Sequence, residues 1–421
     1  MRKKHAALPV AALVVAMGLA GCTSGPQSAN GGGDGKTITW EGFSGDKTVQ
    51  PIIDEFEKEN PGTTVKFTGL PYPQILTQIN TQLVSKTAGD IVTVFPGEGN
   101  PIAVQTLAKN KYLADLSSQS WTKSFTSAQK QVMGTDGKVY LAANNYTIIP
   151  AIYNSQALTA VGAKAPTTFS DVLALCAAAK SKGKVAYAMA GATGGTALYL
   201  PYALTSTLVY GPDSKFSEDQ ADGKATFSDS KWTDALDQVT QMNKAGCFSK
   251  SPNGVSLDTA QTQVAKGDAV GIVTVGNQIA TIQGKAASGT TFETAAFPAT
   301  DNSSDTYLPV ALGAGYGVNA NSKNQALAKK FIEFFMSKNG IDSAIKSGSI
   351  FPSISNGTFT HDKVLDGVLE QAAGTKTTAF PDQLWPNSNV QQVTTNQLQN
   401  ILGGTTSSSA ALEQMDKAYN Q

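Results

Sequence analysis

The sequence predicts an α/β protein built from open sheets with helices on their faces. Short apolar and β-branched runs alternate with segments in which apolar residues recur at helical spacing. Apart from Thr93, the run 91–95 is continuously apolar, which is typical of a parallel strand buried on both faces. A chain of 421 residues is also long enough for two domains of ordinary size.

The first ordered elements form a predicted β-α-β unit. A strand over 37–40 breaks at Glu41 and the following glycine. Apolar residues at 49, 52, 53 and 56 then predict a helix, which ends at an Asn-Pro-Gly turn over 60–62. A second strand over 65–67 completes the unit. Alternation of this kind favours a largely parallel sheet.

The same pattern continues with a helix over 74–86 and the buried strand 90–95, which ends just before Glu98. In open α/β sheets, ligands bind outside the carboxyl ends of the strands. Trp40, Glu41 and Glu98 lie at such predicted ends, and we therefore expect them near a ligand.

The start of the chain has the layout of a secretory signal, with basic residues at 2–4 followed by an apolar run over 6–20. The sequence Leu-Ala-Gly-Cys at 19–22 resembles the bacterial lipobox, which implies that a diacylglyceryl group is attached to Cys22. The alternative is an ordinary signal whose cysteine is incidental. Residues 22–36 are rich in Ser, Gly and Asn, and we expect a flexible tether there after a signal peptide over 1–21.

Charge, cysteine and histidine counts exclude several classes of function. The formal net charge is zero and no basic stripe occurs, so nucleic acid is not an expected partner. Beyond the signal and Cys22, only Cys176, Cys247 and His361 remain, too few for a His-rich or Cys-rich metal site. The two cysteines either form a disulfide or stay as buried free thiols, since spacing alone does not establish the geometry.

Five segments, in order along most of the chain, together carry a family pattern. They are a Gly-Lys-Val-Tyr-Leu strand, a Tyr-Asn pair with a Pro-Thr-Thr-Phe-Ser-Asp helix start, a Gly-Asp-Ala-Val turn after a helix, a glycine-rich return strand and an aromatic helix. Their positions are 137–141, 153–171, 264–276, 313–318 and 326–335.

The five segments closely resemble the family 1 extracellular solute-binding proteins of carbohydrate ABC importers. Two departures concern the loop near the first segments: Phe169 stands where the family usually has tryptophan, and no proline follows Leu141. Thr168 with Asp171 three residues later predicts a helix cap at this point.

The resemblance implies a two-lobed, periplasmic-binding-protein-like fold of type II, in which each lobe is an open sheet flanked by helices and the ligand cleft lies at the hinge. The sequence permits crossings between the lobes at 144–147 and 312–316. The expected lobes are 37–145 with 314–345, and 146–313 with 346–421.

The resemblance also implies capture without catalysis. A solute that contacts both lobes stabilises their closed arrangement, which a membrane permease and an ATPase then recognise. We expect a monomer on the extracytoplasmic face of the bacterial membrane, with a lipid anchor, a carbohydrate ligand, and neither cofactor nor metal.

A sugar site needs flat aromatic faces for the C–H side of the ring, and planar amides or carboxylates for the hydroxyl groups. For Trp40 the alternative is a structural role in the core of the sheet, and for Tyr146 it is a packing role at the hinge. The candidates are neutral or acidic, which favours a neutral sugar or oligosaccharide. The expected ligand-binding residues are Trp40, Glu41, Glu98, Asn144, Asn145, Tyr146, Tyr199, Tyr202, Asn277, Tyr316 and Trp385.

Two alternatives stay open at this point. A secreted glycoside hydrolase uses two carboxylates, and Glu41 with Glu98 is a candidate pair, although no hydrolase motif occurs. The same fold with a non-sugar solute, such as a polyol, a peptide or an amine, is the other alternative, because the family pattern marks architecture more than ligand.

Overall fold

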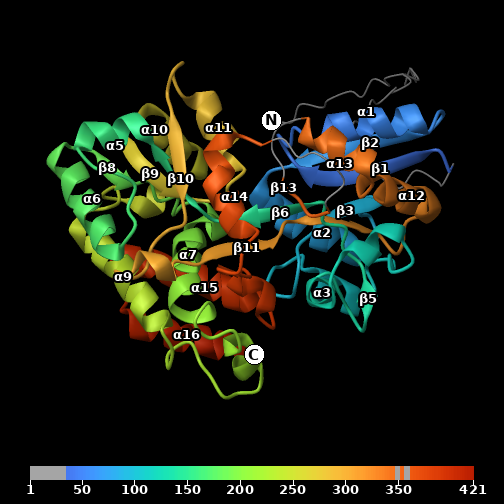
Figure 1. The fold of residues 1–421 in the computed structure, drawn as a ribbon. Coiled ribbons are helices and arrows are strands. Elements are labelled where there is room, and N and C mark those ends of the chain that lie inside the picture. The colour runs from blue at the N-terminus through green and yellow to red at the C-terminus, as the bar shows by residue number, and fades with distance from the viewer. Residues whose placement is uncertain (1–34, 347–350, 355–360) are drawn as a thin grey trace, which may run out of the picture.

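The computed structural model describes residues 35–346, 351–354 and 361–421. The expected signal peptide, Cys22 and most of the tether lie outside the described residues. The described elements form two α/β lobes, which occupy the two sides of Figure 1, with the strands β6 and β11 running between them. The predicted two-lobed fold is confirmed.

The first lobe is built on a four-stranded sheet in the order β12-β3-β1-β2. β1 pairs in parallel with β2 and β3, and β12 is antiparallel to β3. Its elements are β1 (Thr37–Phe43), α1 (Val49–Glu59), β2 (Thr64–Leu70), α2 (Tyr72–Ser85), β3 (Ile91–Val94), β12 (Gly315–Val318), α12 (Gln325–Phe335) and α13 (Lys338–Ile345).

Helical spacing predicted the buried faces of this lobe correctly. All four apolar residues expected on the first helix are buried in α1, and the apolar face of the aromatic helix, formed by Leu327, Phe331, Phe334 and Phe335, is buried in α12. Trp40 is fully buried between these helices and the sheet, and its ring centroid lies 5.2 Å from that of Phe331 and 5.1 Å from that of Phe67. Large aromatic side chains therefore fill the space between sheet and helices.

One boundary differs from the sequence prediction in a way that matters for the site. The first strand was expected to end at Trp40, whereas β1 continues to Phe43 because Glu41, Gly42 and Phe43 stay paired with β2. The pairing with a neighbouring strand overrides the local break that the glycine indicated. The carboxyl end of β1 is consequently Phe43.

The second lobe contains a four-stranded sheet in the order β10-β7-β9-β8. β9 is parallel to β8 and antiparallel to β7, which also pairs antiparallel with β10. Its elements include β7 (Ala151–Asn154), α5 (Ser155–Val161), α6 (Phe169–Ser181), β8 (Val185–Tyr187), α7 (Tyr199–Thr205), α9 (Trp232–Ala245), α10 (Leu257–Lys266), β9 (Ala269–Val273), α11 (Gln278–Lys285), β10 (Phe292–Ala295), α15 (Ser388–Leu402) and α16 (Ser408–Tyr419).

The second lobe has its own apolar core and a disulfide. Cys176 at the core face of α6 is bonded to Cys247, which follows α9. Thr168 and Asp171 form a capping box at the start of α6, as the sequence predicted. Trp232 and Trp385 are buried in the same core, with ring centroids 6.3 Å apart.

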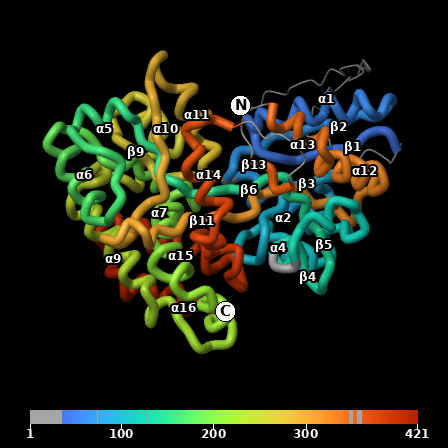
Figure 2. Tube along the Cα trace, in the orientation of Figure 1, coloured from blue at the N-terminus to red at the C-terminus, as the bar shows by residue number. Residues whose placement is uncertain are grey.

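A third sheet, in the order β13-β6-β11-β14, lies between the two lobes. β6 is antiparallel to β11 and to β13, and Leu312 is paired with Tyr146. The two segments expected to cross between the lobes thus lie side by side, and Figure 2 shows the trace passing through this region. These strands are β6 (Asn145–Ile148), β11 (Leu308–Leu312), β13 (Phe351–Pro352) and β14 (Thr377–Thr378).

Short elements complete the described chain. They are α3 (Val104–Lys109), α4 (Ser127–Gln131), β4 (Gly134–Thr135), β5 (Lys138–Val139), α8 (Phe216–Ala221), α14 (Asp366–Ala372), the π-helical turn η3 (Ser206–Tyr210) and the 3₁₀ turns η1 (Ser120–Ser124), η2 (Gly194–Leu198), η4 (Pro252–Gly254), η5 (Ser303–Asp305), η6 (Lys363–Leu365) and η7 (Pro381–Leu384). Among the described helices, none is long and apolar enough to cross a membrane.

Candidate functional site

A cavity of about 560 Å³ lies between the lobes, next to the hinge sheet. Its wall is formed by the carboxyl ends of β1 and β3, the start of α2, the hinge segments 144–147 and 312–316, and parts of α7, α11, α15 and η7. The volume is in the range of small-molecule sites, about 300–1,000 Å³. It is the natural site for a solute that contacts both lobes.

The first lobe contributes an aromatic wall. Phe43 ends β1, Phe95 follows β3, and Tyr72 begins α2, so the sheet edge brings all three together. The rings of Phe43 and Tyr72 are 6.1 Å apart and nearly parallel, at 21°, and Phe95 meets both edge-on. Burial raises the pKa of Tyr72 to about 12, with a smaller contribution from the negative charge of Asp382. Tyr72 is therefore a neutral hydrogen-bonding phenol with an apolar face.

The second lobe contributes a matching aromatic wall. Tyr199 and Tyr202 come from successive turns of α7, and the ring of Phe380, just before η7, lies 6.3 Å from that of Tyr202. Burial raises the pKa of both tyrosines, and Asp382 contributes to both shifts. Aromatic groups therefore line the cavity from both lobes, an arrangement suited to the two C–H faces of a sugar ring.

Neutral polar groups lie at the hinge side of the cavity. Asn144 is almost fully buried, and its Oδ1 accepts a hydrogen bond of 3.0 Å from Nδ2 of Asn145. Asn277 is exposed at the start of α11, next to Gln278. Each amide offers both a donor and an acceptor, as a hydroxyl-rich ligand requires.

Few charged residues line the cavity. Lys47 is the cation among its described lining residues, and it is exposed. Asp46 is engaged locally, because its Oδ1 accepts hydrogen bonds from the backbone N–H and the hydroxyl of Thr48 at 2.9 and 2.7 Å. Asp382 accepts a hydrogen bond at Oδ2 from Gln391, at 2.6 Å, and its buried Oδ1 has no hydrogen-bond partner among the described residues. Within the described ranges, no cluster of three or more His, Cys, Asp or Glu residues is suited to a metal ion.

The structure brings six of the eleven expected ligand-binding residues to this cavity. Tyr316 lines the cavity and has its ring against that of Trp40, at a centroid distance of 4.8 Å. The other five come from the hinge, α7 and the start of α11. The six are Asn144, Asn145, Tyr199, Tyr202, Asn277 and Tyr316.

Trp40 and Glu41 do not line the cavity, because β1 extends past them. Trp40 has no exposed surface and packs in the core of the first lobe. Glu41 is 4% exposed, and its Oε1 accepts a hydrogen bond of 2.9 Å from the backbone of Gly89, which precedes β3. The side chain of Glu41 is therefore held at the amino end of β3, where burial raises the pKa of the carboxyl.

Glu98, Tyr146 and Trp385 do not line the cavity either. Glu98 forms an ion pair of 2.6 Å with Lys109. Tyr146, in the hinge strand β6, packs against two cores, and its hydroxyl contacts Gln129. Trp385 is 2% exposed in the core of the second lobe. Neither carboxylate of the candidate hydrolase pair therefore reaches the cavity.

Sequence reasoning missed several residues that the structure places there. Phe43 and Phe95 were visible as the last aromatic residues of two strands, and a longer first strand would have singled them out. Tyr72, Asp382 and Gln391 carry no such signal, since they reach the cavity only through the packing of α2, η7 and α15.

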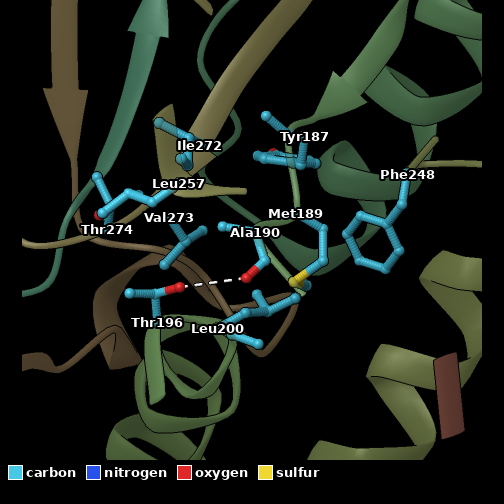
Figure 3. A pocket seen from close by; sticks show the side chains of 12 residues that line it. Tyr187, Met189, Ala190, Thr196, Leu200, Phe248, Leu257, Ile272, Val273 and Thr274 are labelled. Carbon is cyan, nitrogen blue, oxygen red and sulfur yellow. Dashed lines mark hydrogen bonds between the residues drawn. The ribbon is translucent and has the colours of Figure 1, made fainter. Parts of the chain in front are cut away.

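A second, much smaller cavity lies inside the second lobe, behind the wall that Thr196 and Leu257 share with the larger one. Figure 3 shows its apolar lining, with the hydroxyl of Thr196 donating to the carbonyl of Ala190 at 3.2 Å. Its volume of about 10 Å³ corresponds to one water molecule at most. It is a packing defect beside the main site and too small for a solute.

The sequence profile of the bacterial extracellular solute-binding proteins matches residues 51–358, which is most of the chain. The chain belongs to this family of bacterial extracellular solute-binding proteins. Its role is accordingly solute binding and not catalysis, as the sequence predicted.

Individual relatives are similar at low identity. The chain is 25% identical over 151 residues to the multiple sugar-binding protein of Streptococcus mutans, a match that spans 36% of this chain and 35% of the relative. A solved chitin oligosaccharide binding protein shares the fold with a TM-score of 0.80 at 19% identity, covering 92% of this chain and 99% of the other. A sugar transporter protein of Bacillus licheniformis in complex with stachyose has a TM-score of 0.70 at 19% identity, covering 90% and 98%.

Proposed function

We propose that this solute-binding protein captures a neutral sugar or oligosaccharide and delivers it to the permease of an ABC importer. The observation that carries the proposal is the pair of aromatic walls, Phe43 with Tyr72 on one lobe and Tyr199 with Tyr202 on the other, with hinge amides between them. The similar proteins, which include a multiple sugar-binding protein and a chitin oligosaccharide binding protein, support the same ligand class.

Tyr72 is the residue best placed to couple the ligand to closure. Its hydroxyl lies 3.7 Å from the position that a Cβ on Gly195 would occupy, so a first-lobe side chain reaches the surface of the second lobe. A ligand between Tyr72 and Tyr199 contacts both lobes at once. Its affinity for the closed arrangement exceeds that for the open one, which is the condition for a ligand to shift the equilibrium.

The charge of the cavity supports a neutral ligand. Recognition of a carboxylate or phosphate commonly uses the planar fork of arginine. The only arginine of the chain is Arg2, within the expected signal peptide, and Lys47 is the sole described cation at the cavity. Amides and hydroxyls outnumber charges, as expected for a ligand whose polar groups are hydroxyls.

The proposed location is the outer face of the cell membrane, with Cys22 as the lipidated residue. Two or more acyl chains give stable anchoring, and the segment 23–36 is then long and polar enough to separate the lobes from the bilayer. Replacing Cys22 with serine should move the protein from the membrane fraction to the medium and abolish incorporation of labelled palmitate. Unchanged palmitate labelling would contradict the lipobox assignment.

We also propose where the two lobes divide and which oligomeric state the protein has. We place the first lobe at 37–145 with 314–345 and the second at 146–313 with 346–421, and we expect a monomer. The separate apolar cores and the disulfide within the second one support this division.

Thermal melting of the purified protein tests the proposed function. A panel of mono- and oligosaccharides, polyols, peptides and amines is added one at a time, since selective binding raises the melting temperature by mass action. We expect a saturable rise with a neutral sugar and no new reducing ends after overnight incubation. Tyr72→Ala should abolish the rise, whereas Tyr112→Ala, in the same lobe but away from the cavity, should retain it. A rise only with an amine or a peptide would overturn the sugar assignment.

A further inference from the structure

The turn η7 is held tightly between the hinge and the first lobe. Nε2 of Gln383 donates a hydrogen bond of 2.9 Å to the carbonyl of Leu312, at the end of the hinge strand β11. On the other side, a Cβ added to Gly99 would lie 2.0 Å from the backbone oxygen of Asp382. The hydrogen bond of Gln383 on one side and the close backbone approach of Gly99 on the other therefore fix where the side chain of Asp382 begins.

The carboxylate of Asp382 is only half satisfied. Oδ2 accepts a hydrogen bond of 2.6 Å from Nε2 of Gln391, which comes from α15. Oδ1 is buried and accepts no hydrogen bond from the described residues, although Asp382 lines the cavity. A buried carboxylate oxygen without a donor is costly, and because Asp382 lines the cavity, a ligand bound there can supply the missing donor.

Among the described residues, none forms an ion pair with this carboxylate. The titratable groups that interact with it electrostatically are neutral tyrosines: Tyr72 from α2, Tyr199 and Tyr202 from α7, and Tyr210 from η3. In the loop 96–100, Glu98 is bonded to Lys109. Burial raises the pKa of Asp382 to about 6, while the hydrogen bond from the Gln391 amide acts in the opposite direction. The nearby backbone N–H groups at 382 and 383 also lower the pKa, although neither makes a hydrogen bond of normal geometry to Oδ1.

We propose that Asp382 is the specificity-determining residue of the second lobe, whose Oδ1 accepts a hydrogen bond from a ligand hydroxyl and so couples sugar capture to proton release. The inference rests on the proposed function. It specifies the chemistry of one end of the ligand. That end must carry a hydroxyl that donates a hydrogen bond beside the wall formed by Tyr199 and Tyr202. A sugar whose hydroxyl is replaced by hydrogen or by a methoxy group at that position is discriminated against.

The direction of the pH effect follows from which form the ligand stabilises. A donated hydrogen bond favours the charged carboxylate and lowers its pKa in the complex. Sugar binding is therefore strongest above about pH 6 and weakens as the pH falls below the pKa of the free protein. Between pH 7.5 and pH 5 the dissociation constant should rise roughly tenfold, because the pKa of free Asp382 is about one unit above the lower pH.

Isothermal titration with chitotriose, raffinose and stachyose at pH 5 and pH 7.5 tests the inference, using the full chain and the variant Asp382→Asn. The substitution keeps the size of the side chain and removes its charge. We expect affinity to fall about ten- to a hundred-fold at pH 7.5, the effect of a hydrogen bond to a charged group, and the pH dependence to vanish. The melting temperature without sugar should stay level or rise, since an unpaired buried charge is removed.

Asp222→Asn is the matched control, because Asp222 is exposed on the second lobe and paired only with Lys224 at 2.7 Å. It should keep both the affinity and the pH dependence of the wild type. Equal affinity and equal pH slope in Asp382→Asn and the wild type would overturn the role of Asp382 alone. Failure of every neutral sugar to bind the wild type would refute the proposed function, and this inference with it.

Discussion

Replacing Trp385 distinguishes two roles for its side chain: packing in the core of the second lobe, and stacking against a sugar ligand. The indole is 2% exposed, and its ring centroid lies 5.9, 6.1 and 6.3 Å from those of Phe227, Tyr202 and Trp232. An aromatic side chain of this kind buries roughly 150–250 Å². At about 25 cal/mol per Å², the transfer term alone is about 4–6 kcal/mol, close to the 3–5 kcal/mol typical of Trp→Ala in a core.

We therefore expect Trp385→Ala to lower the free energy of unfolding of the second lobe by about 4 kcal/mol. For a domain of 150–250 residues, this corresponds to a fall in melting temperature of roughly 8–16 °C. Calorimetry resolves the effect, because the two lobes have separate cores and only one contains Trp385.

Trp385→Phe provides the decisive comparison, since it keeps an aromatic ring in the core. We expect it to bind sugar within about twofold of the wild type, because the ring lies outside the cavity lining. Tyr72→Ala should behave in the opposite way, with little loss of stability and a large loss of affinity. A tenfold loss of affinity in Trp385→Phe at an unchanged melting temperature would refute the core role and restore the stacking hypothesis.

Three further variants test the second lobe and its contact with the first. Replacing Cys176 and Cys247 with alanine should destabilise the second lobe by up to about 4 kcal/mol in chemical unfolding, because the bond closes a 71-residue separation. Gly99→Ala should weaken sugar binding by about 1–3 kcal/mol in titration calorimetry, since its Cβ meets the backbone oxygen of Asp382. Thr274→Val should raise the free energy of unfolding by about 1 kcal/mol, because the buried Oγ1 has no hydrogen-bond partner in the described part of the chain.

Each of these substitutions has a distinct contradictory outcome. Reducing agent that leaves the wild-type melting temperature unchanged would argue against the disulfide. For the glycine, the control is Gly284→Ala in α11, where nothing lies within 4 Å of the added Cβ, and equal affinity in the two variants would show that the contact at η7 does not matter. A lower melting temperature for Thr274→Val would indicate that the hydroxyl has a partner, such as a water in the small cavity of Figure 3.

The sequence by itself determined the fold class and the order of the elements. The helix faces over 49–56 and 327–335 were predictable because an amphipathic helix repeats every 3.6 residues regardless of its surroundings. The capping box at Thr168 was also predictable, because its donor and acceptor groups lie within one helical turn. The five family segments then indicated the two-lobed arrangement and a solute-binding role.

Residues at predicted crossings were also well placed by the sequence. Asn144 and Asn145 line the cavity because the crossing segment itself forms its wall, and Tyr316 follows the second crossing. A position argument of this kind needs only the order of the elements along the chain. It does not depend on the length of any single strand.

Only the tertiary structure decided which aromatic and acidic side chains reach the cavity. Side chains alternate between the two faces of a strand, and pairing with β2 extends β1 to Phe43, so Trp40 is buried beneath the sheet instead of standing at its edge. Asp382 and Trp385 are three residues apart, yet the turn η7 directs one to the cavity and the other to the core. Such choices follow from contacts between segments far apart in sequence, which no local pattern encodes.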